Sequence, residues 1–86
     1  MPQSVRPEPA APLRLLQRPV CLLCLEAEWV LAQAGIDQFQ RVDIERDPAL
    51  EERYGIRIPL LIDAAGRELD WPFDPAAVED WLAAAQ

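Results

Sequence analysis

The segment Arg18-Pro-Val-Cys-Leu-Leu-Cys-Leu25 contains the only two cysteines of this 86-residue chain. It follows a short apolar run, residues 13–16, that fits a buried strand, and it begins a predicted helix that extends to about Ala34. A strand that leads directly into a helix places Cys21 at the helix N-terminus, where free backbone N–H groups and the helix dipole favour a thiolate. Cys24 lies three residues further on the same helical face, within reach for a disulfide. The segment therefore predicts a reversible dithiol/disulfide pair.

Apolar residues of the predicted helix recur at the spacing of one helical face, which we expect to be buried: they are Leu23, Ala27, Val30, Leu31 and Ala34. Cys24 aligns with this face, so we expect it to point inward and to leave Cys21 as the exposed thiol. We expect the helix to end at Gly35. Trp29 and, near the end of the chain, Trp81 are assigned to helix packing.

The remaining chain predicts the element order β-α-β-α-β-β-α, with strands at about 13–17, 39–44, 57–62 and 67–70. Asp47-Pro48 and Asp74-Pro75 each combine a good N-cap with a proline at the first helical position, and Gly55 suits the end of the second helix. In the last helix, the expected buried residues are Val78, Trp81, Leu82 and Ala85. A parallel strand pair, an antiparallel hairpin and three helices predict an α/β fold with a four-stranded mixed sheet and helices on both faces.

Length and composition limit the possible architecture and location. A chain of 86 residues, half of them apolar, allows one globular domain. We expect residues 1–12, which are rich in proline, to be a disordered tail, and residues 13–86 to be the domain. No apolar run approaches the roughly 20 residues that span a bilayer, and the first residues lack the apolar core of a signal peptide. We therefore expect a cytoplasmic protein, in which a lone cysteine pair is more often catalytic or metal-binding than structural.

Charge and the missing histidine exclude further classes of function. The net charge is −7, and every positive charge is an arginine. So acidic a chain is a poor candidate for binding nucleic acid or an anionic membrane, both of which need a basic face. The chain has no histidine. Hydrolase-type triads and histidine-based metal sites are thereby excluded.

A Cys-x-x-Cys at the first strand-to-helix junction of this order resembles the glutaredoxin/thioredoxin superfamily. More narrowly, the chain is similar to the small bacterial glutaredoxin-like proteins of the DUF836 type. The matching motifs are Leu-x-x-Arg-x-x-Cys-x-x-Cys at 15–24, Val-Asp-Ile at 42–44, Asp-Pro at 47–48, Tyr-Gly at 54–55, Arg-Ile-Pro-Leu-Leu at 57–61 and Leu-Asp-Trp-Pro-Phe-Asp at 69–74. The resemblance covers nearly everything outside the tail, and it implies a thioredoxin-like fold of the glutaredoxin type.

The resemblance also implies the chemistry of a thiol–disulfide oxidoreductase. Cys21 would attack a substrate disulfide as thiolate, and Cys24 would resolve the mixed disulfide. Pro59 would be a cis-proline that faces the dithiol and exposes the backbone of Ile58 to an extended substrate. No cofactor beyond the dithiol is implied, and the partner is either glutathione, as a co-substrate, or a protein disulfide.

Four further residues are candidates for substrate binding. Arg18 and Arg57 would lie near Cys21 in this fold, either to stabilise the thiolate and recognise an anionic substrate or as ordinary surface arginines. Leu22 and Trp71 could form an apolar rim for the substrate, although Trp71 also fits a packing role. A monomer is expected.

The chain departs from the superfamily at two places. Leu-Leu stands at 22–23, where glutaredoxins typically have Pro-Tyr and thioredoxins Gly-Pro. The segment 70–74 replaces the Gly-Gly-x-Asp-like segment through which glutaredoxins bind glutathione. The sequence therefore leaves the choice between glutathione and a protein partner open.

Two alternatives to a redox enzyme stay open. The chain could be a non-catalytic binding module with the same fold, or a dimer that shares a metal or iron–sulfur site through its cysteines. A structural zinc site needs four ligands, which two cysteines without histidine do not provide in one chain. An acidic cluster is interpreted as solvated surface rather than as a metal site; it comprises Asp43, Glu45, Asp47, Glu51 and Glu52.

Overall fold

The structure is a computed structural model that describes residues 13–85, so the predicted tail, residues 1–12, lies outside the described residues. The elements are β2 (Arg14–Gln17), α1 (Leu22–Gln33), β3 (Gln40–Asp43), the 3₁₀ helix η1 (Ile44–Arg46), α2 (Pro48–Tyr54), β4 (Leu60–Ile62), β5 (Glu68–Asp70) and α3 (Pro75–Ala83). Their order confirms the predicted α/β fold. Among the described residues, no helix is long and apolar enough to cross a membrane.

The four strands form one mixed sheet in the order β3-β2-β4-β5. β2 runs parallel to β3 and antiparallel to β4, and β4 forms an antiparallel hairpin with β5. Leu15 of β2 lies opposite Leu61 of β4 at the centre of the sheet. The two inner strands are the most apolar because both of their faces are covered.

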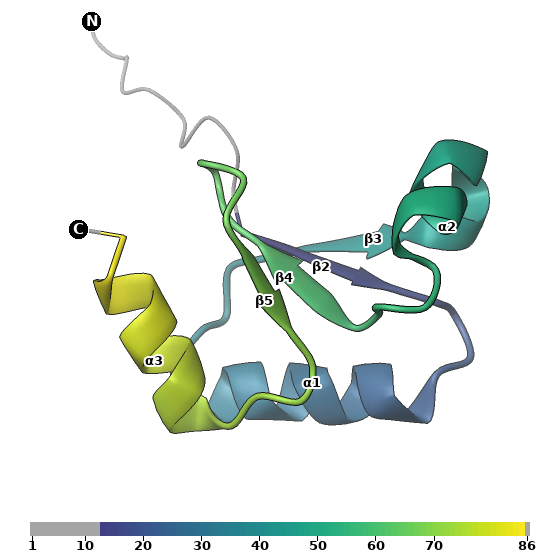
Figure 1. The fold of residues 1–86 in the computed structure, drawn as a ribbon. Coiled ribbons are helices and arrows are strands. Elements are labelled where there is room, and N and C mark those ends of the chain that lie inside the picture. The colour runs from purple at the N-terminus through teal and green to yellow at the C-terminus, as the bar shows by residue number, and fades with distance from the viewer. Residues whose placement is uncertain (1–12, 86) are drawn as a thin grey trace, which may run out of the picture.

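Successive side chains of the inner strands point to opposite faces of the sheet, and this divides the core into two clusters. In the first core cluster, Leu15 and Leu61 pack with residues of α1 and α3 on one face of the sheet. In the second core cluster, Leu16, Leu60 and Ile62 pack with residues of η1 and α2 on the other face. Figure 1 shows α1 and α3 on one side of the strands and α2 beyond the other side, which confirms helices on both faces.

The predicted helix ends are confirmed. The Asp47 carboxylate accepts the N–H of Ala49 at the start of α2, and the Asp74 carboxylate accepts the N–H of Ala77 at the start of α3. Gly35, with φ of 83°, takes the left-handed conformation that ends α1.

Gly55 ends α2 for a different reason, since its φ of −55° is right-handed. A Cβ at this position would lie 2.5 Å from the carbonyl oxygen of Glu51, so the close approach of the two backbones requires glycine.

Some boundaries and burial predictions were wrong. β4 begins at Leu60 rather than at residue 57, because the preceding residues form the turn that leaves α2. Leu23 is 48 % exposed and Trp29 is 64 % exposed, although both were expected to pack. Ala85 is also exposed, beyond the end of α3. α1 is apolar on most of its sides, so the sequence pattern did not distinguish the side that contacts the sheet.

Candidate dithiol active site

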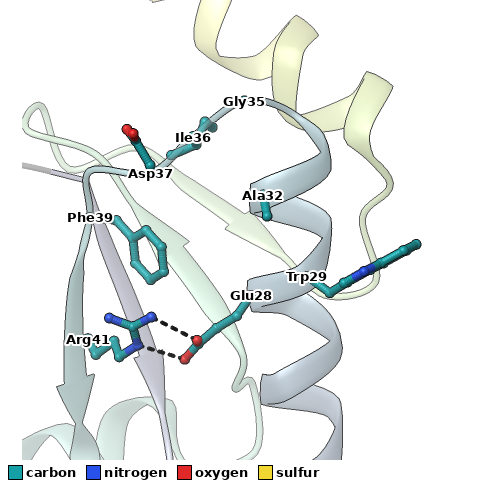
Figure 2. Close-up of a pocket in the computed structure, with 8 residues that line it drawn as sticks. All are labelled: Glu28, Trp29, Ala32, Gly35, Ile36, Asp37, Phe39 and Arg41. Carbon is teal, nitrogen blue, oxygen red and sulfur yellow. Dashed lines mark hydrogen bonds and ion pairs between the residues drawn. The ribbon is translucent and has the colours of Figure 1, made fainter.

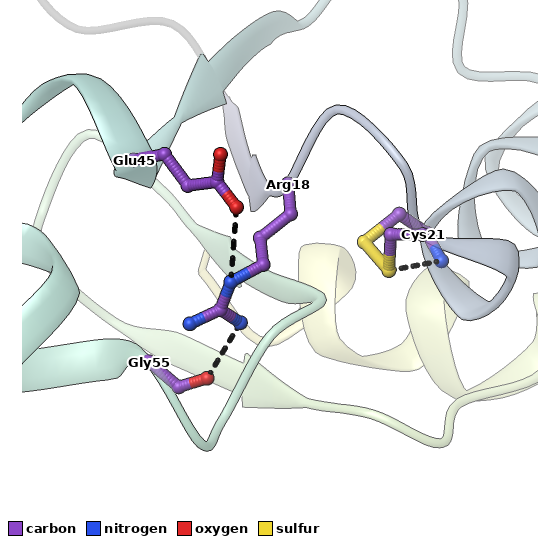
Figure 3. Close-up of a disulfide and its surroundings, with 5 residues drawn as sticks. Arg18, Cys21, Glu45 and Gly55 are labelled. Atoms are coloured by element: carbon purple, nitrogen blue, oxygen red, sulfur yellow. Dashed lines mark hydrogen bonds and ion pairs between the residues drawn. A yellow bond between two sulfur atoms is a disulfide. The ribbon is translucent and has the colours of Figure 1, made fainter.

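Cys21 and Cys24 form a disulfide at the start of α1, with their Cα atoms 5.2 Å apart. Cys21 is the N-cap of the helix, in an extended conformation with φ of −151° and ψ of 107°. Its Sγ accepts the backbone N–H of Cys24 at 3.2 Å, the contact drawn in Figure 3. The sulfur of Cys21 therefore occupies the position in which side-chain oxygens usually cap a helix.

The two sulfurs have different surroundings. Cys24 is 2 % exposed and points toward the core, whereas Cys21 is partly exposed at the surface. The predicted orientation of the pair is confirmed. Cys21 is therefore the cysteine of the pair that solvent can reach, while Cys24 is shielded by the protein.

Local backbone geometry favours negative charge on the sulfur of Cys21. The first N–H groups of α1 have no partner within the helix, and one of them already donates to this sulfur. The partial positive charge of the helix N-terminus adds to this effect. Both effects stabilise a thiolate over a thiol once the disulfide is reduced.

Arg18 points away from the disulfide and joins the loop before α1 to α2. Figure 3 shows its guanidinium between Glu45 and Gly55. It donates to the Gly55 carbonyl oxygen at 2.9 Å and also to the Glu51 carboxylate, with Glu45 at 3.5 Å. Within residues 13–85, no hydrogen bond joins this guanidinium to a sulfur. A role for Arg18 in substrate binding stays a prediction.

Arg57 is paired across the hairpin with β5. It donates to Glu68 at 2.7 Å and to Asp70 at 3.0 Å, and these hydrogen bonds raise the pKa of Arg57. Its charge is thus compensated by two carboxylates of the same chain. Recognition of an anionic substrate by this side chain also stays a prediction.

The Ile58–Pro59 peptide bond is cis, as the family resemblance implied. Pro59 is fully buried directly before β4, and Ile58 packs partly against the second core cluster. The Trp71–Pro72 bond is cis as well, which the sequence did not predict. Contact between Ile58 and a substrate stays a prediction.

The two candidates for an apolar rim differ in their contacts. Leu22 is 74 % exposed directly beside Cys21. Trp71 packs against the first core cluster, with its ring 5.0 Å from that of Phe73 in an edge-to-face arrangement. The packing of Trp71 stabilises the turn before α3, and its contact with a substrate stays a prediction.

A family model described as a glutaredoxin-like domain (DUF836) matches residues 12–83. The chain belongs to this glutaredoxin-like family. No curated protein matches it.

Solved structures similar to this glutaredoxin-like domain include that of the structural-genomics target protein XcR50 from X. campestris. The chain in its X-ray structure is 51 % identical in sequence to this chain, and the two structures superpose with a TM-score of 0.82. The match covers 86 % of this chain and 99 % of the XcR50 chain. Its solution structure, also 51 % identical, gives a TM-score of 0.81 over 87 % and 96 % of the two chains. Protein Ne2328 from Nitrosomonas europaea, 23 % identical, shares the fold with a TM-score of 0.64 over 94 % of this chain and 98 % of its own.

Four of the five carboxylates of the acidic cluster in this glutaredoxin-like domain serve as caps or ion-pair partners. Asp43 and Asp47 cap η1 and α2, and Glu45 and Glu51 pair with Arg18. In the part of the chain that the structure describes, no three acidic, cysteine or histidine residues are grouped to hold a metal ion.

A hollow of about 670 Å³ lies between the C-terminal half of α1 and the start of β3, remote from the disulfide. Glu28 is seven residues from Cys21, which is roughly 10 Å along the helix. Figure 2 shows Arg41 bridging the gap to Glu28, with two hydrogen bonds of 2.9 Å. These hydrogen bonds lower the pKa of Glu28, against a smaller opposing effect of burial. Trp29 and Ala32 also line the hollow, and the Trp29 ring extends outward from α1 (Figure 2).

Proposed function

We propose that this glutaredoxin-like domain is a thiol–disulfide oxidoreductase, with Cys21 as the nucleophile and Cys24 as the resolving thiol. One observation carries the proposal: Cys21, which is partly exposed, caps α1 and accepts the Cys24 N–H through its sulfur, while Cys24 is buried. An exposed thiolate at a helix N-terminus next to a shielded second thiol is the arrangement that disulfide exchange requires.

The reaction proceeds in two exchange steps. The Cys21 thiolate attacks one sulfur of the substrate disulfide, forms a mixed disulfide and releases the other substrate sulfur as thiolate. Cys24 then loses its proton to solvent and attacks Cys21 Sγ, which forms the Cys21–Cys24 disulfide and releases the second substrate thiolate. Two electrons pass from the protein dithiol to the substrate, and a thiol reductant must supply two electrons to regenerate it.

The proposed substrates are glutathione mixed disulfides or protein disulfides. The domain's own dithiol carries the electrons, so the proposal includes no further cofactor, and glutathione enters only as a co-substrate. A reversible pair of this kind needs a compartment that contains a thiol reductant, which supports a cytoplasmic location.

The proposal is tested by trapping the intermediate. Reduced Cys24→Ser protein is mixed with insulin or with a glutathionylated peptide, and the products are identified by intact mass. The variant should accumulate a mixed disulfide on Cys21, and the wild-type protein should release two substrate thiols and form its internal disulfide. Cys21→Ser is the matched control and should form no adduct. A folded Cys24→Ser protein that reacts with neither substrate would refute the proposed function.

A further inference from the structure

The side of α1 that faces away from the sheet is apolar and uncovered. Leu22, Leu25 and Trp29 are 74 %, 63 % and 64 % exposed, and Ala32 is exposed in line with them. Their spacing of three, four and three residues places them on one face of the helix. We call these four residues the outer stripe. In Figure 1, none of the described elements lies on this side of α1.

The outer stripe begins at the dithiol. Leu22 follows Cys21 directly, and the stripe extends to Ala32, ten residues further on, which is roughly 15 Å along the helix. Val20, just before Cys21, is 96 % exposed and extends the apolar surface around the sulfur. Single exposed apolar side chains are common, but a contiguous row of large ones marks an interaction site.

The charged residues around the stripe indicate whether its partner carries positive or negative charge. The only charged residues of α1 are Glu26 and Glu28, and its last turn carries no basic residue. Glu28 is paired with Arg41, whereas Glu26 forms no ion pair within residues 13–85. The whole chain carries a net charge of −7. An apolar surface with an acidic border on an acidic protein complements a segment that is both apolar and basic.

A second copy of the chain and glutathione both fit this surface less well. Two copies packed through α1 would bring two net charges of −7 together, with only acidic charged side chains on the two helices. Glutathione is an anionic peptide, and both arginines expected near the dithiol, Arg18 and Arg57, are already paired with carboxylates of this chain.

We propose that the outer stripe docks a basic, apolar segment of a partner protein and presents that protein's disulfide to Cys21. The inference rests on the proposed function and specifies its substrate class. An extended segment needs about five residues to span the stripe, at about 3.3 Å per residue. Leu25 and Trp29 lie at the middle of the contact, so they act as positioning residues while Cys21 carries out the exchange.

Reaction rates with matched peptides test the proposal. Two synthetic peptides share the same length and the same leucine and tryptophan content, and each carries one cysteine as a mixed disulfide with 4-thiopyridine. One peptide contains lysines where the other contains glutamates. Reduced Cys24→Ser protein releases thiopyridone from each peptide, and the rate of this release is measured. It is compared with the rate of release from 4,4′-dithiodipyridine, a small neutral disulfide with the same leaving group.

The basic peptide should react about tenfold faster than the acidic one at low salt, with a preference that shrinks as salt is added. In the Cys24→Ser background, the double substitution Leu25→Ser/Trp29→Ser should lower the ratio of two rates by about tenfold: the rate with the basic peptide divided by the rate with dithiodipyridine. Ile56→Ser is the matched control, because Ile56 is 99 % exposed on the loop after α2, outside the stripe. It should leave that ratio unchanged.

Each alternative outcome has a distinct meaning. Equal rates for the two peptides, or a double variant that retains the wild-type ratio, would overturn docking on the stripe and leave the proposed function intact. Failure to react with any of the three disulfides would refute the proposed function itself. Sedimentation that shows a wild-type dimer and a monomeric double variant would assign the stripe to self-association and overturn the proposal of a basic partner.

Discussion

Replacement of Arg18 by methionine should destabilise the domain and leave the reactivity of Cys21 unchanged. Methionine retains an apolar stem of similar length but removes the charge and the donors. The guanidinium joins the loop before α1 to three acceptors: Glu45 of η1, Glu51 of α2 and the carbonyl of Gly55, the residue that follows α2. The variant therefore separates a role in the fold from a role at the sulfur.

The expected loss follows from the contacts of Arg18. A charge-assisted hydrogen bond to a partly buried carbonyl such as that of Gly55 is worth about 1.5 kcal/mol. The pairs with Glu45 and Glu51, which are 53 % and 42 % exposed, add about 0.5 kcal/mol together after solvent screening. We therefore expect the free energy of unfolding to fall by about 2 kcal/mol and Tm to fall by about 8–16 °C.

Urea unfolding of the oxidised proteins measures the loss. Arg46→Met removes an exposed arginine of η1 and is the matched control, with an expected change within about 0.5 kcal/mol. The pH dependence of Cys21 alkylation in the Cys24→Ser background should be the same with and without Arg18→Met. An unchanged unfolding free energy in Arg18→Met, together with an upward shift of the alkylation midpoint, would contradict a purely structural role for Arg18.

Three further changes test the fold. Leu61→Ala empties a fully buried site at the centre of the sheet and should cost about 2–5 kcal/mol in urea unfolding, and a loss under 1 kcal/mol would contradict the assigned core. Asp74→Ala removes the cap of α3 and should cost about 1 kcal/mol, whereas Asp74→Asn should retain most of the stability. Glu28→Gln should cost about 0.5 kcal/mol at pH 7. Because Arg41 lowers the pKa of Glu28 in the folded state, this contribution is present above the pKa of the unfolded chain and is lost as the pH falls through the folded-state pKa. Unfolding at about pH 3 should therefore show a smaller difference between the Glu28→Gln and wild-type proteins, and a difference that grew on acidification would contradict the ion pair.

Local signals predicted much of the fold. The Asp-Pro pairs at 47–48 and 74–75 marked two helix starts, because an N-cap and its proline act on neighbouring residues only. The inward position of Cys24 followed from helical periodicity. The cis bond before Pro59 came from the family resemblance, since an isolated Ile-Pro bond is usually trans.

The missed features depend on contacts between distant segments. Trp29 was assigned to packing because α1 is apolar on most sides, and only the position of the sheet decides which side is covered. The direction of Arg18 depends on Glu45 and Glu51, about thirty residues later, which η1 and α2 bring to the loop before α1. The α1 segment contains more apolar residues than one helical face can bury, and this excess was a signal in the sequence for an exposed apolar stripe.

The pH dependence of Cys21 alkylation tests whether Cys21 is an activated nucleophile. In the Cys24→Ser variant, Cys21 is the only remaining thiol. A sulfur that caps α1 and accepts a backbone N–H should react as a thiolate with a midpoint clearly below the reference thiol value of about 8.5. A midpoint at or above about 8.5 would contradict an activated nucleophile at Cys21.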